Sequence, residues 1–190
     1  MVRLRLAALG AVCLWAATAE PQGPVNWPQF RGADGAGIAD SSVLPTRWSA
    51  TENVAWSAEV PGRGWASPIV WGDRVYVTTA VNAGGFKAPS TGIYGNDYAA
   101  ELKKQGLSDD EILKRVTARD IELASESEDV SYVVLALDAR TGKVVWQREA
   151  HRGKPSGGRH RKNTYASETP ATDGERVYAH FGSRGLTCYD

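Results

Sequence analysis

Residues 151–168, HRGKPSGGRHRKNTYASE, gather cationic and amide side chains whose chemistry is the binding of anions. Such groups donate charge-assisted hydrogen bonds to carboxylates, phosphates and acidic sugars. The loop runs into an expected inner strand, so its second half is predicted to face a ligand. The residues of this predicted ligand-facing surface are Arg159, His160, Lys162 and Asn163. A solvated basic loop without a ligand is the alternative interpretation.

The sequence has no recognisable constellation for catalysis, metal binding or nucleotide binding. His160 has no companions at metal-ligand spacing, and the basic loop lacks the residue order of a P-loop. Residues 32–37, GADGAG, are better interpreted as turns than as a dinucleotide site. We therefore predict no catalytic, cofactor-binding or metal-binding residues in this chain.

The strongest local pattern is a hairpin over residues 136–146, with the form A-x-D-x-x-T-G-K-x-x-W. Its arms are apolar and β-branched, as strands favour. In the turn, Asp138 can accept backbone N–H bonds and Gly142 can adopt a positive φ. Ala136 and Trp146 lie at the far ends of the arms, where the small residue leaves room for the indole.

The strands around this hairpin recur along the chain. SPIVWGDRVYV (67–77) aligns without a gap with TPATDGERVYA (169–179). Once insertions before and after the hairpin are allowed for, the units repeat roughly every 40 residues, which suits a four-stranded propeller blade. The expected strands are 66–71, 74–80, 131–138, 143–149, 168–172, 175–181 and 185–190, with 53–60 as the outer strand of another blade.

The hairpin resembles the tryptophan-docking motif of the pyrroloquinoline quinone (PQQ) repeat, in which the Trp of one blade packs against the neighbouring blade. The residues of this structural docking motif are Ala136, Asp138, Thr141, Gly142, Lys143 and Trp146. The flanks 27–37, 60–79 and 165–182 resemble exported PQQ-like β-propeller proteins. Those proteins are often grouped with the propeller lipoprotein of the outer-membrane β-barrel assembly machinery.

The resemblance implies an all-β fold made of four-stranded antiparallel blades of a PQQ-like, or quinoprotein-like, β-propeller. Such a propeller needs about seven or eight blades of roughly 40 residues. The 190 residues are therefore expected to be an N-terminal fragment with an incomplete propeller. We expect about two blades over residues 53–190, with Trp146 buried between them, and an extended segment over 20–52.

Residues 81–130 are expected to form a helical insertion in this propeller. Ser108 begins a capping box that Glu111 completes, and apolar residues follow at helical spacing. A shorter helix is expected over 97–105. We expect a helical hairpin standing off one propeller face, either as a solvated cap or as a partner-docking element.

The N-terminus has the features of a secretory signal peptide over residues 1–19. A basic start precedes an apolar run that is too short to span a bilayer, and Ala17-Thr18-Ala19 is a cleavage site before Glu20. We expect cleavage there and a periplasmic or secreted protein without a transmembrane segment. Without its signal peptide the chain is slightly acidic, which gives no electrostatic case for nucleic acid.

The sequence leaves more than one class of function open. We favour a non-catalytic binding or scaffold module in cell-envelope protein assembly, without a cofactor and with a protein, a small anion or a glycan as its partner. The alternative is the N-terminal part of a PQQ-dependent quinoprotein dehydrogenase, which would hold PQQ and calcium. A glycan-binding propeller linked to polymer degradation is a third interpretation.

Overall fold

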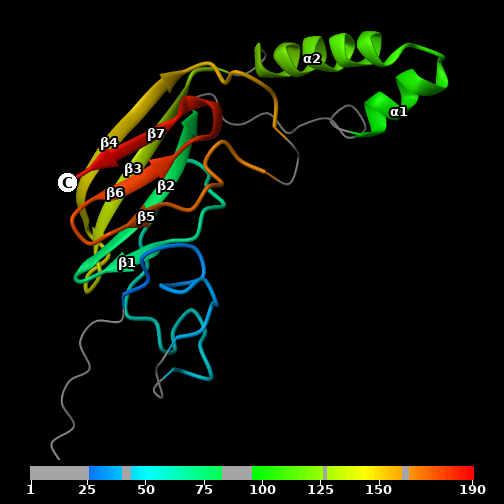
Figure 1. Cartoon of the computed structure of the whole chain (residues 1–190). Coiled ribbons are helices and arrows are strands. Elements are labelled where there is room, and N and C mark those ends of the chain that lie inside the picture. The colour runs from blue at the N-terminus through cyan, green and yellow to red at the C-terminus, as the bar shows by residue number, and fades with distance from the viewer. Residues whose placement is uncertain (1–25, 40–43, 83–95, 126–127, 160–162) are drawn as a thin grey trace, which may run out of the picture.

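The structure is a computed structural model in which two antiparallel sheets lie together and a pair of helices extends away from them (Figure 1). It describes residues 26–39, 44–82, 96–125, 128–159 and 163–190. The predicted signal peptide and its cleavage site lie outside the described residues.

The first sheet has four strands whose spatial order follows the order of the chain. Its strands are β1 (Ile69–Trp71), β2 (Arg74–Asn82), β3 (Val130–Asp138) and β4 (Val144–Gly153). All neighbouring pairs are antiparallel, and β2 and β3 are paired along their whole length. The β-branched run of β3 favours this extended conformation.

The second sheet repeats this order with shorter strands. It contains β5 (Ala171–Thr172), β6 (Val177–His180) and β7 (Leu186–Tyr189), and a short 3₁₀ helix over Gly182–Arg184 joins β6 to β7. These strands lie where the repeat predicts them, except that the inner strands β1 and β5 begin later than expected. Pro68 and Pro170 precede them, and proline has no N–H to donate to a ladder.

The segments before the two inner strands connect the sheets. The N–H of Trp65 donates to the carbonyl of Ala166 at 2.9 Å. The N–H of Ser67 donates to the hydroxyl of Thr169 at 3.0 Å. Residues 27–28 bond in turn to both β1 and β5. The backbone therefore links the two sheets at several points before their inner strands begin.

Strand β3 supplies half of the buried apolar residues of the described structure. It lies between β2 and β4, both of its faces are covered, and all of its residues except the last are buried. Tyr132 and Val134 pack toward the second sheet. Leu135 lies on the other face, where Trp56 and Val60 are packed. Removal of this apolar surface from water is the main stabilising contribution of the fold.

The prediction of an outer strand over residues 53–60 is wrong, because this described segment contains no strand. Trp56 and Val60 instead lie with their side chains against the first sheet, whereas Val54 is exposed. A strand requires a neighbouring backbone with which to exchange hydrogen bonds. The alternation of apolar residues in this segment reflects packing on a sheet face rather than pairing in a ladder.

The long connection between β2 and β3 carries two helices. α1 (Asn96–Lys104) and α2 (Asp109–Ser125) form the expected helical hairpin, which stands away from the sheets (Figure 1). Ser108 caps α2, since its hydroxyl accepts the N–H of Glu111 at 3.4 Å. Among the described residues, neither helix combines the length and the apolar character that crossing a bilayer requires.

The architecture confirms the fold class that the sequence predicts. The strands of both sheets are antiparallel, and the described helices of the α type are confined to the connection between β2 and β3. The chain is therefore mostly β, with its sheets arranged as an incomplete PQQ-like propeller that carries a helical insertion.

Candidate ligand-binding site

The two sheets have two different ends, which we call the turn end and the cavity end. The turn end holds the tight turns that join β1 to β2, β3 to β4, and β5 to β6. The cavity end holds the connections from β2 to β3, from β4 to β5, and from β6 to β7, including the helical hairpin (Figure 1). The turn of the hairpin motif lies at the turn end, and the described residues of the basic loop lie at the cavity end.

Asp138 fixes the turn between β3 and β4. Its Oδ1 accepts the hydroxyl of Thr141 at 2.8 Å and the N–H groups of Thr141 and Arg140 at 2.8 and 3.1 Å. These bonds, and that of the Thr141 hydroxyl most of all, hold the pKa of the Asp138 carboxyl below its ordinary value. Gly142 follows with a φ of 70°, a conformation that side chains with a Cβ disfavour.

An indole ring packs directly against the glycine in each of two turns. A Cβ placed on Gly142 would lie 2.4 Å from Cε3 of Trp56, so the ring lies directly on the glycine. The Nε1–H of Trp56 also donates to the carbonyl of Ala139 at 2.9 Å. In the second sheet, a Cβ on Gly174 would lie 2.5 Å from the indole of Trp71. Each of these turns is therefore joined to an earlier segment of the chain.

Trp146 contacts the second sheet in a different way. It lies opposite Ala136 in the ladder of β3 and β4. Its ring lies 6.0 Å from that of Tyr76 and 5.9 Å from that of Tyr189, measured between centroids. Trp146 is half-buried rather than buried as predicted, because β7, which carries Tyr189, is a sheet edge in the described structure and covers only part of the indole.

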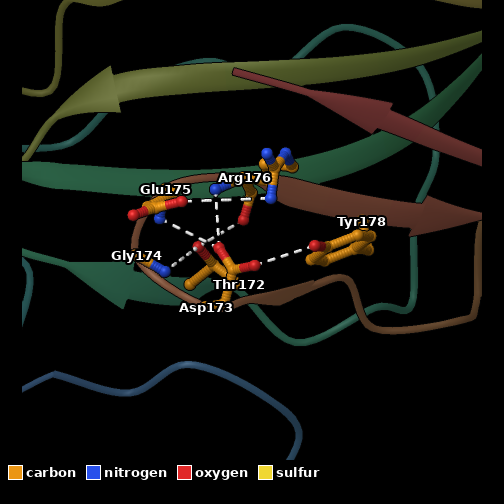
Figure 2. A network of polar contacts seen from close by, with 6 residues as sticks. All are labelled: Thr172, Asp173, Gly174, Glu175, Arg176 and Tyr178. Carbon is orange, nitrogen blue, oxygen red and sulfur yellow. Dashed lines mark hydrogen bonds and ion pairs between the residues drawn. The ribbon is translucent and has the colours of Figure 1, made fainter.

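A polar network holds the turn between β5 and β6 (Figure 2). Oδ1 of Asp173 accepts the N–H groups of Arg176 at 2.7 Å and Glu175 at 2.9 Å, and Oδ2 accepts the hydroxyl of Tyr178 at 2.8 Å. The bond from the Arg176 N–H contributes most to holding the pKa of Asp173 below its ordinary value. Because these bonds lie within one turn, we assign the network a structural role.

A cavity of about 240 Å³ lies at the cavity end, where the two sheets meet. Its walls come from the beginning of β3, the connection between β4 and β5, and the connection between β6 and β7. Segments that are distant in the sequence therefore form one site. The lining residues that matter for its chemistry are Tyr132, Arg159, Asn163, Tyr165, Glu168 and Phe181.

Two of the four residues predicted to face a ligand line this cavity. Nη1 of Arg159 donates to the carbonyl of Asn163 at 3.0 Å. The guanidinium lies 5.9 Å from the centre of the Tyr165 ring. His160 and Lys162 lie outside the described residues. The structure thus brings Arg159 and Asn163 together at the inter-sheet cavity.

Glu168 is a lining residue that the sequence analysis missed. Its carboxylate accepts the N–H of Ser167 at 3.3 Å, and a Cβ on Gly182 would lie 3.4 Å from its Oε1. Glu168 closes the same basic segment that predicted the site, so attention to the acidic residue of that segment could have found it. The cavity therefore has an anionic acceptor as well as cationic and amide donors.

Aromatic residues form the inner wall of the cavity. Tyr132 and Phe181 are each 3% exposed, and their rings meet edge to face with centroids 5.5 Å apart. Burial raises the pKa of the Tyr132 hydroxyl above its ordinary value. These two residues are far apart in the sequence and each is typical of a core strand, so the sequence held no signal that they meet.

The cavity is equipped for binding by hydrogen bonds. A carboxylate accepts hydrogen bonds, a guanidinium donates them and an amide does both, whereas Tyr132 and Phe181 are almost wholly covered by their own packing. Within the described ranges, no group of three or more His, Cys, Asp and Glu side chains is placed to hold a metal ion.

Comparison with known proteins identifies a family. The family model described as outer membrane protein assembly factor BamB matches residues 96–190, which are half of the chain. The match includes both helices, β3, β4 and the second sheet, and so covers the walls of the cavity. A search of curated proteins found no match. The family match shows that the chain is a PQQ-like repeat protein and belongs to the outer membrane protein assembly factor BamB family.

Proposed function

We propose that the chain is an exported PQQ-like repeat protein that acts as a non-catalytic binding or scaffold module in cell-envelope protein assembly. The observation that carries the proposal is the contrast between the two ends of the sheets. Side chains at the turn end hold turns and seat indoles. Long connections at the cavity end line a cavity with polar and aromatic groups. Loops on a rigid scaffold are the usual location of binding groups.

The family name and the N-terminal sequence support a role in the envelope. The name of the matched family refers to outer-membrane protein assembly. N-terminal sequencing of the protein recovered from its native host tests the export. We expect the mature chain to begin at Glu20 and to be found outside the cytoplasm. An uncleaved chain that stays in the cytoplasm would contradict the proposal.

The cavity end is proposed to be the face that binds the envelope partner. A photo-reactive residue at Asn163 reports on this end, and one at Arg140 reports on the turn end, because both positions are exposed. We expect crosslinks to an envelope component in the native host from position 163 and not from position 140. Crosslinks from position 140 alone would show that the partner binds at the turn end.

The absence of catalysis is tested by supplying the cofactor of the alternative function. PQQ and calcium are added to the purified full chain, and the quinone absorbance is followed together with dye-linked oxidation of alcohols and sugars. We expect no stoichiometric uptake and no oxidation, since we propose that the chain has no cofactor. Uptake of one PQQ per chain with substrate oxidation would replace the scaffold proposal with a quinoprotein dehydrogenase.

A further inference from the structure

We infer that Arg184 is a positioning residue for the cavity end, because it holds the basic loop against the first sheet just after β4. It lies at the end of the short 3₁₀ helix between β6 and β7. The inference rests on the proposed function in taking the cavity end as the face that binds the partner. It names a residue that shapes this face through its contacts within the molecule.

The connection that carries Arg184 is fixed by its own backbone. The N–H of Arg184 donates to the carbonyl of Phe181 at 2.9 Å, and the N–H of Gly185 donates to the carbonyl of Gly182 at 3.1 Å. In return, the N–H of Phe181 donates to the carbonyl of Gly185 at 3.1 Å. These bonds within one turn set the place from which the Arg184 side chain extends.

The Arg184 side chain joins three parts of the molecule. Its Nη2 donates to the carbonyl of Lys154, the first residue after β4. Its Cζ lies 6.0 Å from the centre of the Tyr132 ring, which belongs to β3. A planar guanidinium can donate hydrogen bonds in its plane while its face lies against an aromatic ring. Arg184 therefore connects the first sheet, the basic loop and the second sheet.

A second contact joins the same two connections. The hydroxyl groups of Ser156 and Ser183 are hydrogen-bonded to each other. Pro155, which lies between Lys154 and Ser156, is buried. The loop after β4 is therefore attached to the connection between β6 and β7 at two neighbouring points, although it has no regular secondary structure there.

The burial of Arg184 assigns its side chain to contacts within the molecule. The residue is half-buried, and its Nε is buried without a hydrogen-bond partner among the described residues. An unpaired buried N–H costs free energy, which the bond to Lys154 and the contact with Tyr132 have to offset. We therefore assign Arg184 the positioning of the loop rather than direct contact with the partner.

The residues at the proposed binding face lie farther along the same loop. Nη1 of Arg159 donates to the carbonyl of Asn163 at 3.0 Å, and the hydroxyl of Tyr165 donates to the carbonyl of Gly157 at 3.3 Å. Both contacts depend on the course that the loop takes after Lys154. A loop that is ordered in advance loses less conformational entropy on binding, so the contacts of Arg184 favour binding at this end.

NMR order parameters of the full chain test the positioning. Arg184→Ala removes the side chain, and Arg184→Lys keeps the charge but loses the planar group. We expect the order parameters of the Ser156 and Gly157 N–H groups to fall from about 0.85 to below about 0.6 in both variants. Unchanged order parameters in both folded variants would overturn the inference.

Arg148 provides the matched control. It also donates to a backbone carbonyl, that of Gln147 at 3.2 Å, and its Cζ lies 5.7 Å from the centre of the Trp146 ring. Its hydrogen bond stays within β4 and joins no separate segments. Arg148→Ala should therefore leave the order parameters of residues 156 and 157 unchanged. An equal loss of order in this variant would overturn the inference, because the effect would not be specific to Arg184.

Photocrosslinking in the native host shows whether the positioning serves binding. The probe is the photo-reactive residue at position 163. We expect the crosslink yield to fall about tenfold with Arg184→Ala, a factor that corresponds to one charge-assisted hydrogen bond in an equilibrium constant. An unchanged yield in a variant whose loop has lost its order would overturn the link between Arg184 and the binding face.

A disulfide rescue distinguishes positioning from direct contact. Ser156→Cys and Ser183→Cys replace two hydroxyl groups that touch, so the new thiols are placed to form a disulfide in a Cys188→Ser background. In the Arg184→Ala chain, we expect the oxidised pair to restore both the order of the loop and the crosslink from position 163. If order returned without the crosslink, Arg184 would contact the partner itself and the positioning role would be wrong.

The two kinds of measurement separate this inference from the proposed function. A wild-type chain that gives no crosslink from position 163 would contradict the cavity end as the binding face, and the NMR result would still decide whether Arg184 holds the loop. A wild-type chain that crosslinks, together with folded Arg184 variants that crosslink equally well, would overturn only the role of Arg184.

Discussion

Strands β3 and β7 occupy the same place in their two sheets but differ sharply in burial. β3 has a strand on each side and a packed layer on each face, and all but its last residue is buried. β7 pairs with β6 alone among the described strands, and its residues alternate between exposed and half-buried. The difference in burial accompanies a difference in neighbours, because β3 is paired on both sides and covered on both faces whereas β7 is an edge in the described structure.

The two ends of the sheets give a second comparison. At the turn end, both sheets use an Asp at a tight turn and a glycine under an indole. At the cavity end, β2 and β3 are joined through two helices, whereas β6 and β7 are joined by one short 3₁₀ helix. The corresponding turns of the two repeats, β1–β2 and β5–β6, differ as well, because a Cβ on Gly72 would meet no atom within 4 Å whereas a Cβ on Gly174 would meet the indole of Trp71.

The largest expected effect on stability tests the difference in burial between β3 and β7. Leu135 is 1% exposed and Leu186 is 65% exposed. Leu135→Ala should lower the free energy of unfolding by about 2–5 kcal/mol, because it empties a core site. Leu186→Ala should change it by less than about 0.5 kcal/mol. Urea denaturation of both variants measures the difference, and equal losses would show that β7 is as buried as β3.

The next largest effect concerns the indole that joins the sheets. Trp146 is half-buried between Tyr76 and Tyr189, so Trp146→Ala should cost about 2–3 kcal/mol, less than a fully buried aromatic residue. Trp48 is 71% exposed and is the matched control, with an expected change below about 0.5 kcal/mol. Thermal and urea unfolding measure both. Equal changes in the free energy of unfolding for the two variants would show that Trp146 does not stabilise the contact between the sheets.

A smaller effect separates glycines that seat an indole from those that only turn the chain. Gly72 and Gly142 both have positive φ, but a Cβ on Gly72 meets no atom within 4 Å. Gly72→Ala should cost about 1–2 kcal/mol for its backbone conformation. Gly142→Ala should cost a further 1–3 kcal/mol, roughly the penalty for overpacking, because Trp56 must move. If urea denaturation showed equal losses in the free energy of unfolding for the two variants, the close packing of Trp56 on Gly142 would be contradicted.

The smallest effect compares the acid sensitivity of the two turns. Hydrogen bonds hold the pKa of Asp138 and of Asp173 below the ordinary value of 3.8. A lowered folded pKa contributes stability above pH 3.8, and this contribution is lost as the pH falls from 3.8 through the folded pKa. Asp173→Asn and Asp138→Asn should therefore each reduce the slope of stability against pH below 3.8. Unchanged slopes would show that neither carboxyl contributes to the acid sensitivity of the fold.

Much of the fold could be predicted because the sequence patterns that indicate its strands lie within single segments. The β-branched run at 131–138 favours a strand, and the repeat of GDRVY as GERVY placed the same hairpin in the second sheet. The segment 53–60 was misassigned because the same alternation arises when side chains lie on a sheet without backbone pairing. Periodicity reports which side chains are covered, and it does not report whether a ladder exists.

The candidate site was only partly predictable for a related reason. Arg159 and Asn163 were found because they lie in one basic loop. Tyr132 and Phe181 reach the cavity only because the two sheets dock, and each residue alone is typical of a strand core. Sites formed between blades require the docking geometry, which no single segment encodes.

Native-state hydrogen exchange of the full chain tests the docking of the two sheets most directly. The N–H of Trp65 lies before the first sheet and bonds to the carbonyl of Ala166, which lies before the second. If the sheets form one cooperative unit, this amide should be protected nearly as strongly as the amides of β3, such as that of Val134. Exchange of the Trp65 amide at the rate of an unstructured loop, while Val134 stays protected, would contradict the account.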